Sequence, residues 1–301
     1  MKWGILATGN IAKKFASTIN QMSKENEQLV AVGSRNIESA KAFANEHDIP
    51  RYYDSYEALV KDQDVEAVYV ATPNTLHYEN CRLCLEHGKH VLCETPMVLK
   101  EDEAKGLFKL AEDNGLVLME ANKTAHCPAF NHLMVMIKSG LIGEVVDIEA
   151  SLSQLLDKNG REFDPVQAGG SMFEEGSYPL LPIIKLMGTE YLDLDFYSRM
   201  EDGIDVYTHG IFHYPKATCS FKVGLGVKTE GDLVVSGTKG YAYVPSPWWK
   251  TDYFELRYED QNENKKYFYK WDGYGLRYEI QEFISCIING RYSSARLRRK
   301  E

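Results

Sequence analysis

The chain lacks long hydrophobic runs and lacks an excess of basic residues. No window approaches the roughly 20 consecutive apolar residues that a membrane span requires, so no contact with a membrane is expected. Its 34 Lys and Arg residues are outnumbered by 44 Asp and Glu residues, which gives a net charge of -10. Sequence-independent binding of nucleic acid needs a basic surface, so nucleic acid is not expected as a partner either.

Cysteine is scarce and scattered. The six cysteines stand at 81, 84, 93, 127, 219 and 286, and the one close pair, Cys81 and Cys84, has no second pair to complete a metal site. We therefore predict packing thiols and no metal. The first residues lead directly into a strand pattern, without the basic and apolar segments of a signal peptide. A reducing cytoplasm is the expected compartment.

Strand-like and helix-like patterns alternate over the first 120 residues. Buried-strand patterns occur at residues 2–6, 29–33, 51–53, 68–71, 91–93 and 117–119. Helical patterns lie between them at residues 11–22, 37–47, 76–87 and 100–114, with a further helix starting at Ser55. Such alternation predicts a doubly wound parallel sheet, and we assign residues 1–122 to an α/β domain.

The pattern changes near residue 123. A helix at 128–140 precedes segments that alternate polar and apolar residues, as half-buried antiparallel strands do. These segments lie at residues 145–155, 194–199, 206–214, 217–227, 231–236, 241–244, 253–258 and 266–271. Further helices are predicted at 172–187 and 276–289. We predict that residues 123–301 form an α+β domain with an open, largely antiparallel sheet.

The turn after the first strand has the character of a dinucleotide-binding loop. Such loops follow the pattern Gly-x-Gly-x-x-Gly/Ala, and this chain has Ala7, Gly9 and Ala12 at the three positions. A helix beginning at Asn10 and Ile11 would present free N–H groups to phosphates. An ordinary strand–helix turn is the alternative, which the surrounding strand–helix–strand context disfavours.

The end of the second strand bears on the choice of dinucleotide. A fold that prefers NAD places Asp or Glu there, on the ribose hydroxyls. This chain has Ser34 and Arg35, which can hydrogen-bond and neutralise a 2′-phosphate. NADP is therefore predicted, with NAD as the alternative; a surface Arg35 without a ligand is the other interpretation.

A strand-end loop follows the fourth strand. It contains Thr72, Pro73, Asn74 and His77, and proline stops the strand at the edge where ligands bind in such sheets. We predict that these residues line the cofactor groove. For His77 a simple role at the start of a helix is the alternative.

The most informative segment runs from His90 to Met97. An apolar run ends at Glu94, Thr95 and Pro96, so these residues lie just beyond the carboxyl end of a strand. The segment resembles the Glu-Lys-Pro signature of the Gfo/Idh/MocA oxidoreductase family, with Thr95 in place of Lys. In that family the Lys lies between substrate and nicotinamide.

The resemblance covers residues 1 to about 290 and is closest to the dihydrodiol-dehydrogenase-like branch. It is carried by residues 3–6, 34–35, 93–97, 118–121 and 235–240. It implies a Rossmann domain at 1–122, with Glu94 on the cofactor side, and a substrate and dimerisation domain at 123–301. Family members usually continue into one more helix, so a last helix is expected to be missing.

The resemblance also assigns partners to the position of Thr95. The segment that starts at Gly169 and Gly170 resembles the family's second-domain helix, which places Glu174 at its Asp position and Tyr178 at its His or Tyr position. Residues four apart lie on one helix face, and a tyrosine hydroxyl can pass a proton. An ordinary helix pair without chemistry is the alternative.

Lys123 is the candidate for the missing ammonium. It lies in the segment 119–128, after the last strand of the first domain, together with His126. Two interpretations remain open: Lys123 or His126 polarises the substrate oxygen, or Lys123 is solvated and the protein is catalytically weak or inactive.

The sequence therefore predicts an NADP-linked oxidoreductase, with NAD possible, that acts on a sugar, polyol or cyclic diol. A dinucleotide-binding or sugar-nucleotide-sensing protein is the alternative. The family resemblance also implies a homodimer, or a higher homo-oligomer, through the second-domain sheet. The aromatic stretch from Trp248 to Phe254 is interpreted as part of that interface, or as the floor of a sugar site.

Overall fold

The structure is a computed structural model that describes residues 1–22 and 26–297. The chain forms two compact units. The first contains Met1–Lys123 together with the described residues from Asp272 on, and the second contains Thr124–Trp271. The sequence placed everything after residue 122 in the second domain. The structure differs because the last helix packs with the first unit, which a local pattern cannot reveal.

The first unit is built on a six-stranded sheet in which every neighbouring pair is parallel. Its strands are β1 (Lys2–Leu6), β2 (Gln28–Gly33), β3 (Arg51–Tyr53), β4 (Ala67–Val70), β5 (His90–Cys93) and β6 (Leu118–Glu120). Their order is β3-β2-β1-β4-β5-β6, so the chain reverses direction across the sheet between β1 and β4. Ligands of such sheets bind beyond the carboxyl ends of strands at this reversal. The predicted doubly wound sheet is confirmed.

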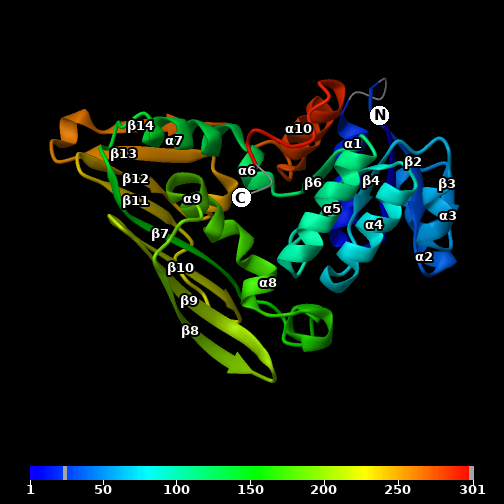
Figure 1. The fold of residues 1–301 in the computed structure, drawn as a ribbon, viewed down its shortest axis with the longest axis horizontal. Coiled ribbons are helices and arrows are strands. Elements are labelled where there is room, and N and C mark those ends of the chain that lie inside the picture. The colour runs from blue at the N-terminus through cyan, green and yellow to red at the C-terminus, as the bar shows by residue number, and fades with distance from the viewer. Residues whose placement is uncertain (23–25, 298–301) are drawn as a thin grey trace. The chain divides into compact units, whose positions relative to one another are not determined.

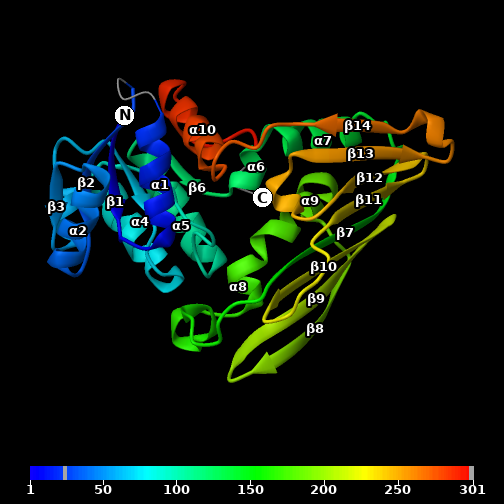
Figure 2. The same cartoon turned by 180° about the vertical axis from the view of Figure 1, so that it is seen from behind.

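Helices cover both faces of this sheet (Figures 1 and 2). They are α1 (Asn10–Gln21), α2 (Ile37–His47), α3 (Tyr56–Val60), α4 (His77–Glu86), α5 (Glu101–Asp113) and α10 (Leu276–Ile288). One buried cluster joins α1, α2 and α10 to one face, and a second joins α3, α4 and α5 to the other. Ser55 caps α3 by accepting a hydrogen bond from the N–H of Ala58, as its Ser-x-Glu start predicts.

Aromatic packing ties α10 into the first unit. Trp3 of β1 has its ring centroid 5.3 Å from those of both Phe15 in α1 and Phe283 in α10. Phe15 in turn stacks on Tyr69 of β4 at 3.8 Å. All four side chains are fully buried. Large buried aromatic groups contribute several kcal/mol each on burial, roughly in proportion to area, so α10 is an integral part of this unit.

The second unit is built on an eight-stranded, mostly antiparallel sheet, as predicted. Its strands are β7 (Val145–Gln154), β8 (Asp193–Glu201), β9 (Ile204–Tyr214), β10 (Ala217–Leu225), β11 (Leu233–Gly237), β12 (Gly240–Val244), β13 (Tyr253–Tyr258) and β14 (Lys265–Phe268). The order is β14-β13-β12-β11-β7-β10-β9-β8, with one parallel pair, β7 and β10. Alternate residues of β9 are buried, which is the pattern of a strand with one covered face.

Three helices cover one face of this sheet: α7 (Pro128–Lys138), α8 (Ser171–Glu175) and α9 (Ser177–Met187). Helix α8 contacts β9 and β10, and α9 contacts β7 and β10 (Figure 2). The single helix predicted at 172–187 is instead divided at Gly176. Pro179 has no N–H to donate to the carbonyl of Glu175, so the regular pattern loses a hydrogen bond that would cross this point.

Short helical segments complete the chain. They are α6 (Lys123–His126) and five 3₁₀ turns at Asn74–Leu76, Arg161–Phe163, Pro165–Gln167, Trp248–Lys250 and Gln261–Glu263. Within residues 1–22 and 26–297, none of the helices combines the length and the apolar character needed to cross a bilayer.

The aromatic stretch near Trp248 does not match its predicted place at an interface. Trp248 is fully buried within the second unit, and its indole N–H donates to the carbonyl of Ser151 at 2.8 Å. Phe254 is also fully buried and stacks on Tyr267. These residues are core. The open face of the sheet instead carries Tyr243 and Arg257, whose guanidinium lies 4.6 Å from the centre of that ring.

Candidate functional site

The first strand–helix turn has the backbone of a dinucleotide-binding loop. Ala7 has a φ of 84°, the left-handed conformation for which the usual pattern has glycine. Its N–H donates to the carbonyl of Gly33 at 2.9 Å, which fixes the turn against β2. Ala12, at the third position, is fully buried against the sheet. The turn therefore has the backbone conformation that the first glycine of the pattern supplies, and the small buried residue that its third position requires.

Gly9 leaves open space in front of α1. A Cβ atom at this residue would meet no described protein atom within 4 Å, although its φ of -74° suits any residue. Gly9 is the N-cap of α1, and no side chain caps this end. The first N–H groups of α1, from Asn10 and Ile11 on, therefore begin at an open approach, with no acidic residue in the first turn. This arrangement fits a pyrophosphate.

Ser34 and Arg35 lie at the end of β2, as predicted. Ser34 is buried, and its hydroxyl accepts a hydrogen bond from the N–H of Asn36 at 3.3 Å. Arg35 is exposed and interacts with the hydroxyl of Tyr56. Burial raises the pKa of Tyr56, and the Arg35 guanidinium opposes that rise. The guanidinium is thus held beside the strand end instead of extending freely from it.

The loop after β4 is tightly held. Thr72 and Asn74 are buried, and the hydroxyl of Thr72 accepts from Asn80 at 3.1 Å. His77 is 1% exposed, with one ring nitrogen 2.6 Å from the carbonyl of Thr72 and the other 2.8 Å from that of Pro96. His77 therefore joins this loop to the loop that holds Thr95. Its predicted contact with a cofactor stays a prediction.

Glu94 is half-buried and is the centre of a cluster of polar groups beside Thr95. The hydroxyl of Tyr69 donates to its carboxylate, and the N–H of Thr95 donates to it as well. Burial raises the pKa of Glu94, while electrostatic attraction to Lys123 is the largest effect that lowers it. Glu120, at the end of β6, accepts a hydrogen bond from the N–H of Met97 at 2.9 Å. Burial raises the pKa of Glu120 as well.

Lys123 belongs to this cluster. It is half-buried at the start of α6 and interacts electrostatically with Glu94 and with Glu279 of α10. Lys123 is thus partly shielded from solvent, and its role in place of the signature lysine stays a prediction. His126, the other candidate for the missing ammonium, is completely buried and belongs to the second unit.

Sequence reasoning missed Glu279 and Tyr69. Tyr69 lies within the apolar strand pattern at residues 68–71, where the sequence does not distinguish it from a packing residue. The position of Glu279 could be recognised from the sequence. It lies three residues after Leu276 and four before Phe283, so it shares the apolar face of α10. A charged residue on such a face is unusual, and this is the signal by which the sequence could have indicated Glu279.

In the second unit, Glu174 is paired with a residue that the sequence did not predict. Arg161 donates one hydrogen bond to each carboxylate oxygen of Glu174, at 2.9 and 3.0 Å. The side chain of Glu174 is only 10% exposed. Tyr178 is buried at the start of α9. The division at Gly176 falls between them, so they do not lie on one uninterrupted helix as predicted.

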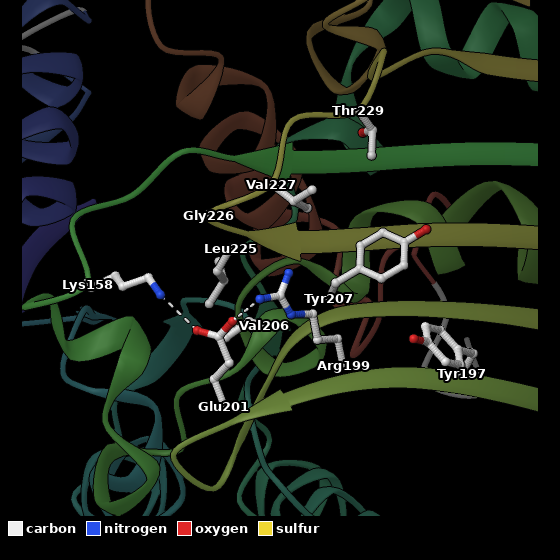
Figure 3. Close-up of a pocket in the computed structure, with 10 residues that line it drawn as sticks. All are labelled: Lys158, Tyr197, Arg199, Glu201, Val206, Tyr207, Leu225, Gly226, Val227 and Thr229. Atoms are coloured by element: carbon white, nitrogen blue, oxygen red, sulfur yellow. Dashed lines mark hydrogen bonds and ion pairs between the residues drawn. The ribbon is translucent and has the colours of Figure 1, made fainter.

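A cavity of about 400 Å³ lies at one end of the second-unit sheet (Figure 3). Glu201 stands on one wall and pairs with Lys158 at 2.8 Å and Arg199 at 2.6 Å. Tyr197 and Tyr207 line the other side. None of the residues predicted for the site lines this cavity.

Comparison with known proteins identifies the family. Residues 1–122 match the model described as "Oxidoreductase family, NAD-binding Rossmann fold", and residues 130–243 match that of the GFO/IDH/MocA C-terminal domain. The chain belongs to the Gfo/Idh/MocA family. The predicted family is therefore confirmed, and membership makes the chain an oxidoreductase with a dinucleotide-binding domain.

Relatives of similar length share about a third of the sequence. The trans-1,2-dihydrobenzene-1,2-diol dehydrogenase of Bos taurus is 32% identical over 298 residues, which cover 96% of this chain and 89% of that protein. The Homo sapiens protein of the same name is 30% identical, with 98% and 90% covered. These likenesses confirm the predicted branch of the family.

Two solved structures have the same fold. A 3-ketoreductase from Actinomadura kijaniata in complex with NADP and TDP-benzene has a TM-score of 0.86 at 22% identity, covering 97% of this chain and 91% of that one. A levoglucosan dehydrogenase in complex with NADH and levoglucosan has a TM-score of 0.85 at 19% identity, with 98% and 91% covered. The cofactors of these proteins agree with the predicted NADP or NAD, and the open turn at Gly9 fits either.

Proposed function

We propose that the protein is an NADP-linked oxidoreductase that transfers hydride between a CH–OH carbon of a sugar, polyol or cyclic diol and nicotinamide, with Lys123 in the role of the missing signature lysine. The observation that carries this proposal is the electrostatic contact of Lys123 with Glu94, the residue before Thr95. Lys123 thus supplies an ammonium group near the end of β5, where Thr95 replaces the signature lysine. The diol dehydrogenase relatives support the substrate class.

The residues divide the work between binding and proton transfer. Ala7, Gly9, Asn10 and Ile11 would hold the pyrophosphate, and the bound nicotinamide would supply or accept the hydride. In the reductive direction the substrate carbonyl gains hydride at carbon and a proton at oxygen, and Lys123 Nζ donates that proton. In the oxidative direction the same amine takes the hydroxyl proton. Glu94 stabilises the ammonium form.

The cofactor preference is proposed from the end of β2. Arg35 supplies a positive charge, and Ser34 supplies a hydroxyl, where a 2′-phosphate would lie. Fluorescence titration should therefore show tighter binding of NADPH than of NADH. Arg35→Ala should remove most of that difference and leave NADH binding unchanged. Equal affinities in the unaltered protein would refute the preference.

Turnover tests the proposal as a whole. NADP reduction over a panel of sugars, polyols and cyclic diols, and NADPH oxidation with the matching carbonyl compounds, should reveal at least one substrate. Lys123→Ala should then lose most of its turnover while it still binds NADPH. Lys100→Ala is a suitable control, since that side chain is 77% exposed on the same unit.

A second candidate function is a dinucleotide-binding sensor without turnover. Thr95 favours it, because a hydroxyl cannot supply the positive charge of the signature lysine, and so does the pairing of Glu174 with Arg161. Tight NADPH binding without turnover of any compound in the panel would support the sensor over the enzyme.

We also propose a homodimer through the open face of the second-unit sheet. Exposed tyrosines such as Tyr197 and Tyr241 lie on this face, together with charges of both signs from Arg257 and Asp195. Light scattering should report twice the mass of 34.3 kDa, and Tyr241→Glu should shift it to the monomer. The compartment is proposed to be the cytoplasm, because all six cysteines are free and buried; a fluorescent fusion tests it.

A further inference from the structure

Glu279 is a buried carboxyl group without a hydrogen-bond partner. It lies in the first turn of α10, its exposed fraction is 0%, and neither carboxyl oxygen has a partner among the described residues. Ionising a carboxyl group in such a place reduces the stability of the folded protein by several kcal/mol. Burial raises the pKa of Glu279 well above its usual value, repulsion from Glu94 adds to the rise, and Lys123 opposes it.

The groups around Glu279 form a closed set of charges. Glu94 and Lys123 interact with it directly. Through Glu94 the set extends to the hydroxyl of Tyr69 on β4 and the ammonium of Lys14 on α1, and it also includes Glu120 at the end of β6. The set thus combines titratable groups from elements that are far apart in the sequence.

Charge balance in this set depends on one proton. Two ionised carboxylates at Glu94 and Glu279 would repel each other in a medium of low dielectric constant, and two protonated ones would leave the Lys123 ammonium without a counter-charge. Among Glu94, Glu279 and Lys123, one proton on the two carboxyl groups leaves a single negative charge opposite the Lys123 ammonium. Glu94 already receives hydrogen bonds from Tyr69 and Thr95, which favour its charged form, so the proton rests on Glu279.

We propose that Glu279 is a positioning residue for Lys123: it carries the one proton that Glu279 and Glu94 hold between them, and its ionisation sets how firmly the Lys123 ammonium keeps its own proton. The inference rests on the proposed function, because Lys123 is the proton donor there. As the pH rises, Glu279 ionises and adds a second negative charge beside Lys123. The ammonium then persists to higher pH than Glu94 alone would allow.

The first test is the pH profile of NADPH-dependent carbonyl reduction, with a substrate found in the panel above. Glu279→Gln mimics the protonated carboxyl at every pH, so activity near neutral pH should be retained. The alkaline limb of kcat should move to lower pH by about one unit, the size of a nearby charge effect. Glu279→Asp keeps an ionisable carboxyl group, so its alkaline limb should lie close to that of the unaltered protein.

Glu282→Gln is the matched control. Glu282 lies one turn further along α10, is 9% exposed, and accepts from Ser294 at 2.9 Å and Arg291 at 3.2 Å. This variant should lose stability without moving the limb. A limb that moves equally in both variants would show that α10 acts only through packing, and a limb that moves in neither would overturn the inference.

Infrared difference spectroscopy tests the shared proton without turnover. The unaltered protein at pH 7 should show the carbonyl stretch of a protonated buried carboxyl, Glu279→Gln should lack it, and Glu282→Gln should keep it. A band that persists in Glu279→Gln would overturn the inference. Lys123→Ala separates the two proposals: unchanged turnover there contradicts the proposed function, whereas reduced turnover with an unmoved limb in Glu279→Gln contradicts the role of Glu279 alone.

Discussion

Arg161 and Glu174 form a two-point ion pair, with hydrogen bonds of 2.9 and 3.0 Å from the two guanidinium nitrogens to the two carboxylate oxygens. Family resemblance assigns Glu174 to the proton-handling set, yet this geometry holds the carboxylate against an arginine from the preceding loop. Both lone-pair directions that face Arg161 are occupied. The pair orders the segment that leads into α8.

Arg161→Ala should therefore destabilise the second unit by about 1 kcal/mol, the value expected for a partly exposed two-point pair. Urea unfolding measures this loss of stability. Arg199→Ala is the control, because Arg199 pairs with Glu201 but is 67% exposed, so its loss should cost less. Equal costs for the two variants would contradict a special role for the Arg161–Glu174 pair.

The left-handed backbone at Ala7 predicts a stabilising substitution. A residue with Cβ costs about 1 kcal/mol or more at a φ of 84°, whereas glycine does not. Ala7→Gly should thus raise the free energy of unfolding by up to about 1 kcal/mol, after the greater freedom of glycine in the unfolded chain is subtracted. NADPH affinity should stay the same. A loss of stability would contradict the assigned conformation.

In contrast to Ala7→Gly, Gly9→Ala should change the affinity for NADPH and leave the stability unchanged. The added Cβ meets no described protein atom within 4 Å, so thermal stability should be unchanged. The methyl group would occupy the space through which a pyrophosphate approaches α1, so NADPH binding should weaken about tenfold or more, or about 1.4 kcal/mol. Titration of both variants side by side checks this. Unchanged affinity in Gly9→Ala would place the phosphates elsewhere.

Stability should depend on pH in opposite directions for two carboxyls of α10. Burial raises the pKa of Glu279, so its favourable contribution is complete below the unfolded value of about 4.3 and is lost as the pH rises through the folded pKa. Burial alone would also raise the pKa of Glu282, but hydrogen bonds from Ser294 and Arg291 outweigh it and lower the pKa. Its contribution is present above about 4.3 and is lost as the pH falls through the lowered folded value.

Glu279→Gln should therefore gain stability over the unaltered protein as the pH rises from 5 to 9, because the amide never ionises. Glu282→Gln should be destabilised throughout this range, with a deficit that shrinks only at more acidic pH. Chemical unfolding at a series of pH values measures both. Parallel curves for the two variants would contradict the opposite pKa shifts.

Local patterns predicted most of the fold. The strands and helices of the first unit follow from short apolar runs and periodic faces, and those of the second from strict alternation. The division at Gly176 does not show in the apolar periodicity of residues 172–187, because it depends on the N–H that Pro179 lacks. The membership of α10 in the first unit could not be predicted, since it depends on contacts such as Trp3 with Phe283 across most of the chain.

The candidate site was predicted less completely. Thr95, Glu94 and Lys123 were identified because each follows a strand at its carboxyl end, a position that sequence can reveal. Glu279 and Arg161 were not, because each reaches its partner through tertiary structure. In the proposed account, the charge balance around Lys123 depends on Glu279, which is distant in the sequence. The sequence alone therefore left the role of Lys123 undecided.

The central claim is that Lys123 supplies the ammonium that Thr95 lacks. Hydride transfer in Lys123→Ala, measured in single turnover with saturating NADPH and a validated carbonyl substrate, tests it most directly. We predict a decrease of about 100-fold or more, the usual loss on removing a proton donor, with partial rescue by added alkylamine. A rate equal to that of the unaltered protein would contradict the claim.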